Sequence, residues 1–101
     1  MVRHIVMFKL KPFETPAEKT AKLQEIKTQL EALKDKIDVL RMIRVDFNIN
    51  PAETWDLILT TELDTLADVN TYANHPEHVA VAKGIIGPVK ADRACVDYEV
   101  I

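Results

Sequence analysis

The stretch that decides the fold is Val2-Arg3-His4-Ile5-Val6-Met7-Phe8-Lys9-Leu10-Lys11. Its centre, residues 5–8, is continuously apolar, while both flanks alternate between apolar and polar side chains. A short run of this kind is typical of a strand that is buried on both faces. We therefore predict that residues 2–11 form the central strand of a sheet that is covered on both sides.

An amphipathic helix is predicted after this strand. Thr15 is a good N-cap, Pro16 suits the first helical position, and Glu18 can complete a capping box. Apolar residues then recur at alternating spacings of 3 and 4, at Leu23, Ile26, Leu30, Leu33 and Ile37. This spacing places one apolar stripe along the helix, opposite a face of lysine and glutamate.

Two further strands are predicted from alternating apolar and polar residues, over 39–48 and 55–63. The segment between them, residues 48–53, is rich in Asn and Pro, which favours a hairpin loop. The second of these strands contains aromatic and β-branched residues, which supports the strand prediction.

A second helical region is broken by a proline. Thr65 is a plausible cap for a helix that ends near Asn74, because His75 precedes Pro76 and a residue before proline is pushed away from α geometry. A new helical segment is predicted over 76–83, with Gly84 ending it.

The last strand is predicted over about 91–100, which completes the order β-α-β-β-α-β in a single domain of residues 1–101. This order indicates an α+β, ferredoxin-like fold with an antiparallel sheet. In that fold both helices cover the same face, and no further helix covers the other. Because an exposed apolar sheet face is usually an interaction surface, we expect a homodimer that joins two sheet faces.

Composition narrows the class of protein. The 101 residues include 13 basic and 16 acidic side chains, for a net charge of -3, which disfavours a nucleic-acid partner. No apolar run approaches the roughly 20 residues of a membrane span. Residues 1–10 lack the pattern of a signal peptide, and the single cysteine, Cys95, cannot form an internal disulfide. We therefore expect a cytoplasmic protein with no membrane partner.

The residues best suited to chemistry are Tyr72, His75 and His78, which fall within seven positions around the helix break, together with His4 on the first strand. Imidazole titrates near neutral pH and is a natural general base, while a phenol can donate a hydrogen bond to a carbonyl that becomes an enolate. This set suits proton abstraction next to a carbonyl, without a cofactor.

Structural roles are the alternative for each of these side chains. In this alternative, His75 is only a helix cap or loop residue, and Tyr72 is a core residue with a hydrated hydroxyl. His78 could be a surface histidine near a helix start, and His4 a core histidine with a polar partner.

Metal and nucleophile sites are weaker hypotheses. His75 and His78 flank Glu77, but the chain has no HExxH pattern, Pro76 interrupts the helix, and Cys95 stands alone in a strand with no base near it in sequence. We predict no metal ligand here.

The sequence resembles the stress-responsive dimeric α/β-barrel (Dabb) family. The resemblance rests on the segment His4–Lys11, on the signature Tyr-x-x-His-Pro-x-His from Tyr72 to His78, and on Asp97-Tyr98 near the end. It implies a ferredoxin-like subunit, two of which pair through their sheets to form a barrel.

The resemblance also implies a site. A plant member of the family is a polyketide cyclase that works without a cofactor in a pocket between sheet and helices. Its acid/base pair matches Tyr72 and His78, and a pocket histidine matches His4. Aromatic residues that its first helix contributes to the pocket are replaced here by Leu23 and other aliphatic residues.

Two functional hypotheses follow. The first is a cofactor-independent lyase, cyclase or isomerase that acts on a small carbonyl compound. Tyr72 and His78 would be its catalytic residues. The substrate would be bound in a pocket of a few hundred cubic ångströms by His4, His75 and Leu23. The second is a non-catalytic dimeric protein that binds a small ligand or has a stress-associated structural role.

Overall fold

A computed structural model describes all of residues 1–101, with four strands and three main helices. The strands are β1 (Val2–Leu10), β2 (Met42–Phe47), β3 (Leu57–Leu63) and β4 (Lys90–Glu99), and the helices are α1 (Pro16–Glu31), α2 (Leu66–Asn74) and α3 (Pro76–Val81). A 3₁₀ turn, Ala32–Asp35, extends α1, and a π turn, Ala82–Ile86, and a 3₁₀ turn, Gly87–Val89, follow α3. No helix combines the length and the hydropathy needed to cross a bilayer.

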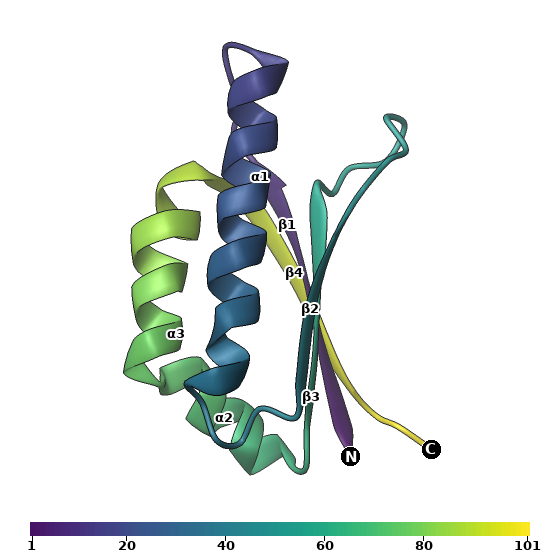
Figure 1. The fold of residues 1–101 in the computed structure, drawn as a ribbon. Coiled ribbons are helices and arrows are strands. Elements are labelled where there is room, and N and C mark those ends of the chain that lie inside the picture. The colour runs from purple at the N-terminus through teal and green to yellow at the C-terminus, as the bar shows by residue number, and fades with distance from the viewer.

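The four strands form one antiparallel sheet in the order β2-β3-β1-β4, with β1 in the interior as predicted. All helices lie on one face of the sheet (Figure 1). The architecture is therefore the predicted α+β, ferredoxin-like fold. The expectation that β1 is covered on both sides is wrong within the chain, because its even-numbered residues are buried under the helices while Arg3, Ile5, Met7 and Lys9 on the other face are only half-buried.

The hydrophobic core lies between the helices and the sheet. The predicted stripe of α1 supplies Ile26 and Leu30, both fully buried, and the stripe continues through Leu33 and Ile37 just beyond the helix. Leu23 packs on the edge of this core and is half-buried. Burying such side chains supplies the main free energy that holds helix to sheet.

The helix starts follow the sequence signals, whereas one predicted helix end is wrong. Thr15 and Thr65 accept hydrogen bonds from the amides three residues on, at 3.2 and 3.1 Å. The chain does not leave helical geometry at Gly84, and it has no glycine with positive φ. Helical turns continue to Val89 because they bury Ile86, and this burial outweighs the roughly 1 kcal/mol helix penalty of a glycine.

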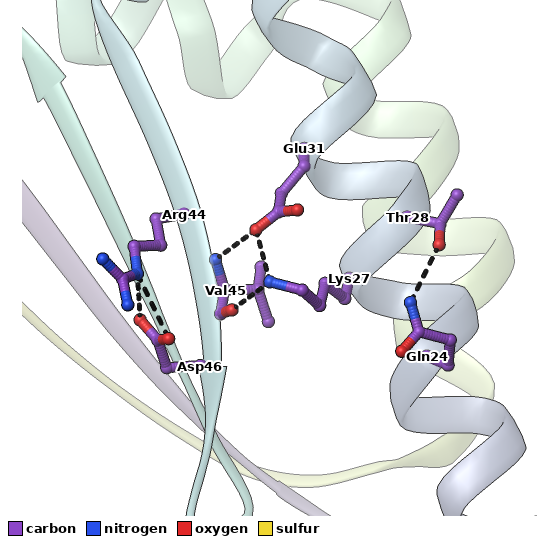
Figure 2. Close-up of polar contacts among 7 residues, drawn as sticks. All are labelled: Gln24, Lys27, Thr28, Glu31, Arg44, Val45 and Asp46. Carbon is purple, nitrogen blue, oxygen red and sulfur yellow. Dashed lines mark hydrogen bonds and ion pairs between the residues drawn. The ribbon is translucent and has the colours of Figure 1, made fainter.

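Helix α1 also protects the free edge of β2. The Val45 amide donates to Glu31 Oε2 at 3.0 Å, and the Val45 carbonyl accepts from Lys27 Nζ at 2.7 Å (Figure 2). Lys27 and Glu31 bind each other at 2.7 Å. The outward amide and carbonyl of Val45, at the middle of this edge strand, are thus satisfied by side chains, which opposes pairing with another chain at this point.

A buried carboxylate ties the end of β1 to α1. Asp56, which is 9% exposed, accepts hydrogen bonds at 2.7 Å from the Leu10 amide and at 2.7 Å from Lys19 Nζ. Burial alone would favour the neutral carboxyl, but these two donors outweigh it and lower the pKa of Asp56. Asp56 is therefore a charged group that belongs to the structural framework.

The sheet face without helices is apolar in its middle and charged toward both ends of β1, at the end with Arg3 and at the end with Lys9 and Asp92. Ile5, Met7 and Ile58 are half-buried there, and Val96 is exposed. At the end of the face Arg3 binds Glu62 at 2.5 Å and Tyr98 Oη at 3.1 Å, which links β3, β1 and β4.

Candidate functional site

The helix break at His75 positions the candidate site. His75 has extended backbone angles, and its Nδ1 accepts a hydrogen bond from the Glu77 amide at 3.1 Å, so that it caps α3. Pro76 occupies the first turn of α3, as predicted. Helices α2 and α3 thus meet at a corner, at the same end of the sheet as both chain termini (Figure 1).

Tyr72 and His78 come together across this corner. Their ring centroids are 4.5 Å apart, and the ring planes are tilted by 50°. His78 Nδ1 lies 2.8 Å from the Ala73 carbonyl oxygen. A carbonyl only accepts, so Nδ1 carries the proton, and the neutral ring has its lone pair on Nε2.

The environment keeps His78 neutral. Burial lowers the pKa of the imidazole, and neighbouring positive charge from His4, Arg93 and His75 lowers it further, although the Ala73 carbonyl partly opposes the shift. A neutral imidazole with a free Nε2 has the properties required of a general base near pH 7.

Tyr72 is fully buried, and its hydroxyl is the only buried side-chain polar atom of the chain that has no hydrogen-bond partner. Burial raises the pKa of this phenol, so it stays protonated and available as a donor. Buried polar groups nearly always have partners, and an exception calls for a functional explanation.

His4 approaches the same place from the sheet. It lies on the helix-facing side of β1, is 7% exposed, and packs edge-on against Tyr72 with ring centroids 6.2 Å apart. Its Nδ1 is 2.5 Å from Asp97 Oδ1 on β4. A carboxylate at this position orients the ring, since it fixes the proton on Nδ1.

A cavity of about 120 Å³ lies beside these groups. His4 and His78 line it together with Lys90 and Arg93 from β4, and the remaining walls are apolar: Val6, Phe8, Leu30, Leu59, Ala73, Ala82 and Ile86. The cavity is smaller than the few hundred cubic ångströms that we expected. A wider hollow of about 510 Å³ near Lys9 and Pro16 is more open and contains no histidine.

Not all of the expected site residues meet at this cavity. His4 and His78 line it, and Tyr72 packs against both rings without lining it. Leu23 and His75 lie outside its lining, and Leu30 provides the contact from α1 that we expected of Leu23. Leu30 lies about two helical turns beyond Leu23 on the same stripe, and it lines the cavity together with Val6 and Phe8 of β1 and Leu59 of β3.

Sequence reasoning missed Lys90, Arg93 and the pairing of Asp97 with His4. The signal that could have revealed them is the register of β4 on β1, which sets Asp97 opposite His4 and Arg93 opposite Phe8. Directly opposite residues on neighbouring antiparallel strands point to the same face. The register itself depends on a bulge between Lys9 and Leu10, and no pattern in the neighbouring sequence predicts this bulge.

Comparison with known proteins agrees with this fold. The family model for Dabb, the stress responsive A/B barrel domain, matches residues 2–100. A dimeric protein of unknown function with a ferredoxin-like fold from Bacteroides fragilis NCTC 9343 is 49% identical, covers 98% of this chain and 95% of its own, and has a TM-score of 0.90.

More distant structures share the architecture. A dimeric ferredoxin-like protein of unknown function from Thermobifida fusca is 28% identical, with coverage of 98% and 90% and a TM-score of 0.80. A hydroxynitrile lyase from Passiflora edulis is 16% identical, with coverage of 99% and 93% and a TM-score of 0.79, a level that shows the fold alone. No curated protein matches the sequence significantly. The family match over nearly the whole chain confirms the resemblance seen in the signature from Tyr72 to His78, and the chain belongs to the Dabb family of stress-responsive A/B barrel domains.

Proposed function

We propose that this protein binds a small carbonyl compound beside Tyr72 and His78 and catalyses proton transfer on it, as a lyase, cyclase or isomerase would. The observation that carries the proposal is the buried Tyr72 hydroxyl without a partner, in ring contact with a neutral histidine that lines a cavity. A substrate carbonyl would supply the acceptor that the hydroxyl lacks.

The chemical roles follow from the two side chains. His78 Nε2 takes a proton from the carbon next to the carbonyl, and the Tyr72 hydroxyl donates a hydrogen bond to the oxygen as negative charge develops there. His4, held by Asp97, is a polar wall of the cavity. Tyr72 is fully buried and does not line the cavity, so the proposal requires the partly buried His78 ring to move and expose the Tyr72 hydroxyl when the substrate binds.

The cavity suggests the size and charge of the substrate. Its volume of about 120 Å³ corresponds to about four water molecules at roughly 30 Å³ each. Lys90 and Arg93 add two cationic side chains to an otherwise apolar lining. We infer that the substrate is a short oxo acid whose carboxylate pairs with these cations.

The direct test is hydrogen exchange on the substrate. Short 2-oxo and 3-oxo acids are incubated with the protein in D₂O, and loss of the proton signal next to the carbonyl is followed by NMR. We expect at least one acid to exchange faster than without protein. Tyr72→Phe and His78→Gln should each lower the catalysed rate at least tenfold.

The matched control is His75→Asn. This histidine belongs to the same signature but lies outside the cavity, and asparagine retains the ability to cap α3. The exchange rate of this variant should stay within about twofold of the original protein. Equal loss in His75→Asn and His78→Gln, or no catalysed exchange with any acid, contradicts the enzymatic proposal.

Ligand binding without exchange would favour the alternative, a non-catalytic dimeric protein that binds a ligand or has a stress-associated structural role. Binding is read from a rise in the melting temperature, since a ligand that binds only the folded state stabilises it by mass action. The amide analogue of each acid serves as the control, because it lacks the charge that Lys90 and Arg93 are proposed to recognise.

We also propose that the protein is a homodimer formed through the helix-free sheet faces. The support is the apolar centre of that face, with Ile5, Met7, Ile58 and Val96, and the dimeric state of the relatives from Bacteroides fragilis and Thermobifida fusca. Light scattering at micromolar concentration should give twice the mass of one chain, and Val96→Asp should shift the protein toward monomer. A monomer in the unmodified protein contradicts this arrangement.

A further inference from the structure

Three metal-ligating side chains meet where β1 and β4 pair. His4 stands directly opposite Asp97, and Val6 stands opposite Cys95, so the register brings all three side chains to the helix-facing side of the sheet. One donor atom from each of His4, Cys95 and Asp97 lies within 4.8 Å of the other two. Neither Tyr72 nor His78 belongs to this group.

The geometry of the group does not suit a nucleophilic cysteine. Cys95 Sγ is 3.5 Å from His4 Nδ1, and Asp97 Oδ1 is 2.5 Å from the same nitrogen. A catalytic triad needs the nucleophile and the carboxylate on the two different nitrogens of the ring, so that one proton can pass while the other is held. A thiol and a carboxylate that converge on one nitrogen resemble instead the corner of a metal site.

Two of the three donor-to-donor distances can be compared with those around a tetrahedral ion, and all three donor atoms lie within 4.8 Å of one another. In a tetrahedral site, typical zinc bonds of about 2.0 Å to nitrogen, 2.0–2.2 Å to oxygen and 2.3 Å to sulfur place nitrogen about 3.5 Å from sulfur and about 3.4 Å from oxygen. The distance of 3.5 Å from Nδ1 to Sγ already matches the first of these values. Asp97 Oδ1, now at 2.5 Å, needs to retreat by about 0.9 Å, and its side chain is one-third exposed and free to do so.

We propose that His4, Cys95 and Asp97 form a three-ligand site for a divalent transition metal ion of the Zn²⁺ class. Sulfur and imidazole ligands select zinc-like ions over Mg²⁺ and Ca²⁺, which prefer all-oxygen sites. A thiolate and a carboxylate together balance the charge of the ion. Cys95 is exposed, which gives the ion an entry path, and three protein ligands leave a fourth position for water or another small molecule.

Binding requires two proton movements. The Cys95 thiol loses its proton to solvent, and the proton on His4 Nδ1 leaves so that the nitrogen lone pair can bind the metal, with the neutral ring then protonated on Nε2. Arg93 lies two residues before Cys95 on the same side of β4, and its positive charge opposes the binding of a cation. We therefore expect moderate rather than very tight affinity.

The test uses Co²⁺ as a spectroscopic probe on the reduced, full-length protein after treatment with a chelator. One equivalent of Co²⁺ per chain should produce a sulfur-to-cobalt charge-transfer band, and Zn²⁺ should remove that band by displacement. Cys95→Ser should abolish the band, and Asp97→Asn should weaken binding at least tenfold. Both side chains are exposed or partly exposed, so circular dichroism should show unchanged folding.

His75→Asn is again the matched control, because this histidine lies outside the group and should leave the band unchanged. The absence of a sulfur-to-cobalt band overturns the proposal. The proposal is also overturned if Cys95→Ser binds Co²⁺ as tightly as the original protein does, because the ion would then be bound by other surface residues. Neither result bears on the exchange test, in which Tyr72 and His78 are the residues that are changed.

Discussion

Two buried polar side chains in this molecule, Asp56 and Tyr72, have opposite surroundings. Asp56 receives hydrogen bonds at 2.7 Å from both the Leu10 amide and Lys19, while the Tyr72 hydroxyl has no partner at all. Both groups lost their contacts with water when the chain folded. Asp56 regained hydrogen bonds within the protein, whereas the Tyr72 hydroxyl did not, and this difference is why we assign Asp56 to the framework and propose Tyr72 for ligand binding.

The largest effect is expected for Asp56→Ala. This change leaves the buried Leu10 amide without an acceptor and Lys19 without a partner, so the free energy of unfolding should fall by about 2–3 kcal/mol in urea denaturation. The control is Lys19→Met, which should cost about 1 kcal/mol or less, because the lysine side chain is nearly half exposed. If both variants lose equal stability, Asp56 stabilises the fold through its ion pair with Lys19 and not through its hydrogen bond with the Leu10 amide.

The contribution of Asp56 should also depend on pH. Its pKa in the folded state is lowered, against about 3.9 in the unfolded chain. A lowered folded-state pKa gives stability that is complete above the unfolded-state value and is lost as the pH falls through the folded-state value.

The stability difference between the original protein and Asp56→Ala should therefore be constant from pH 7 to pH 5 and shrink below about pH 4. Taking the difference removes the contributions of Glu31 and Asp64, whose pKa values are also lowered. Urea titrations at several pH values measure it. A difference that stays constant down to pH 2 contradicts a charged Asp56.

The same two residues show how far sequence reasoning reaches. The contact of Tyr72 with His78 could be predicted because its signals are local: the spacing of the two residues and the helix break at Pro76 are visible in seven residues. The strands, the caps at Thr15 and Thr65 and the order of elements were also predictable, since each depends on neighbours in sequence.

Asp56 falls within the strand predicted over 55–63, and nothing in that pattern distinguishes it from its neighbours. Its partners come from β1 and α1, 46 and 37 residues away, so no local pattern reports the contact. The pairing of His4 with Asp97, 93 residues apart, was out of reach for the same reason. The end of the helical region after α3 was predicted wrongly because the burial of Ile86, a tertiary contact, overrides the local preference of Gly84.

The smallest effect on stability is expected for Tyr72→Phe, because the Tyr72 hydroxyl has no hydrogen-bond partner. Tyr72→Phe removes one oxygen that forms no hydrogen bond within the protein, so the free energy of unfolding should change by less than about 0.5 kcal/mol. The matched control is Thr61→Val, which removes a buried hydroxyl that does donate, to the His4 carbonyl at 3.0 Å, and should cost about 1 kcal/mol.

Together these two variants separate a structural hydroxyl from a functional one. Thr61→Val should lower the free energy of unfolding but leave the rate of substrate exchange by the folded protein unchanged. Tyr72→Phe should leave the free energy of unfolding nearly unchanged but lower the exchange rate. A loss of 1 kcal/mol or more in Tyr72→Phe means that the hydroxyl has a partner in solution, such as a bound water molecule. In that case the open hydrogen-bonding position that we assign to a substrate carbonyl is already filled, and the contrast with Asp56 disappears.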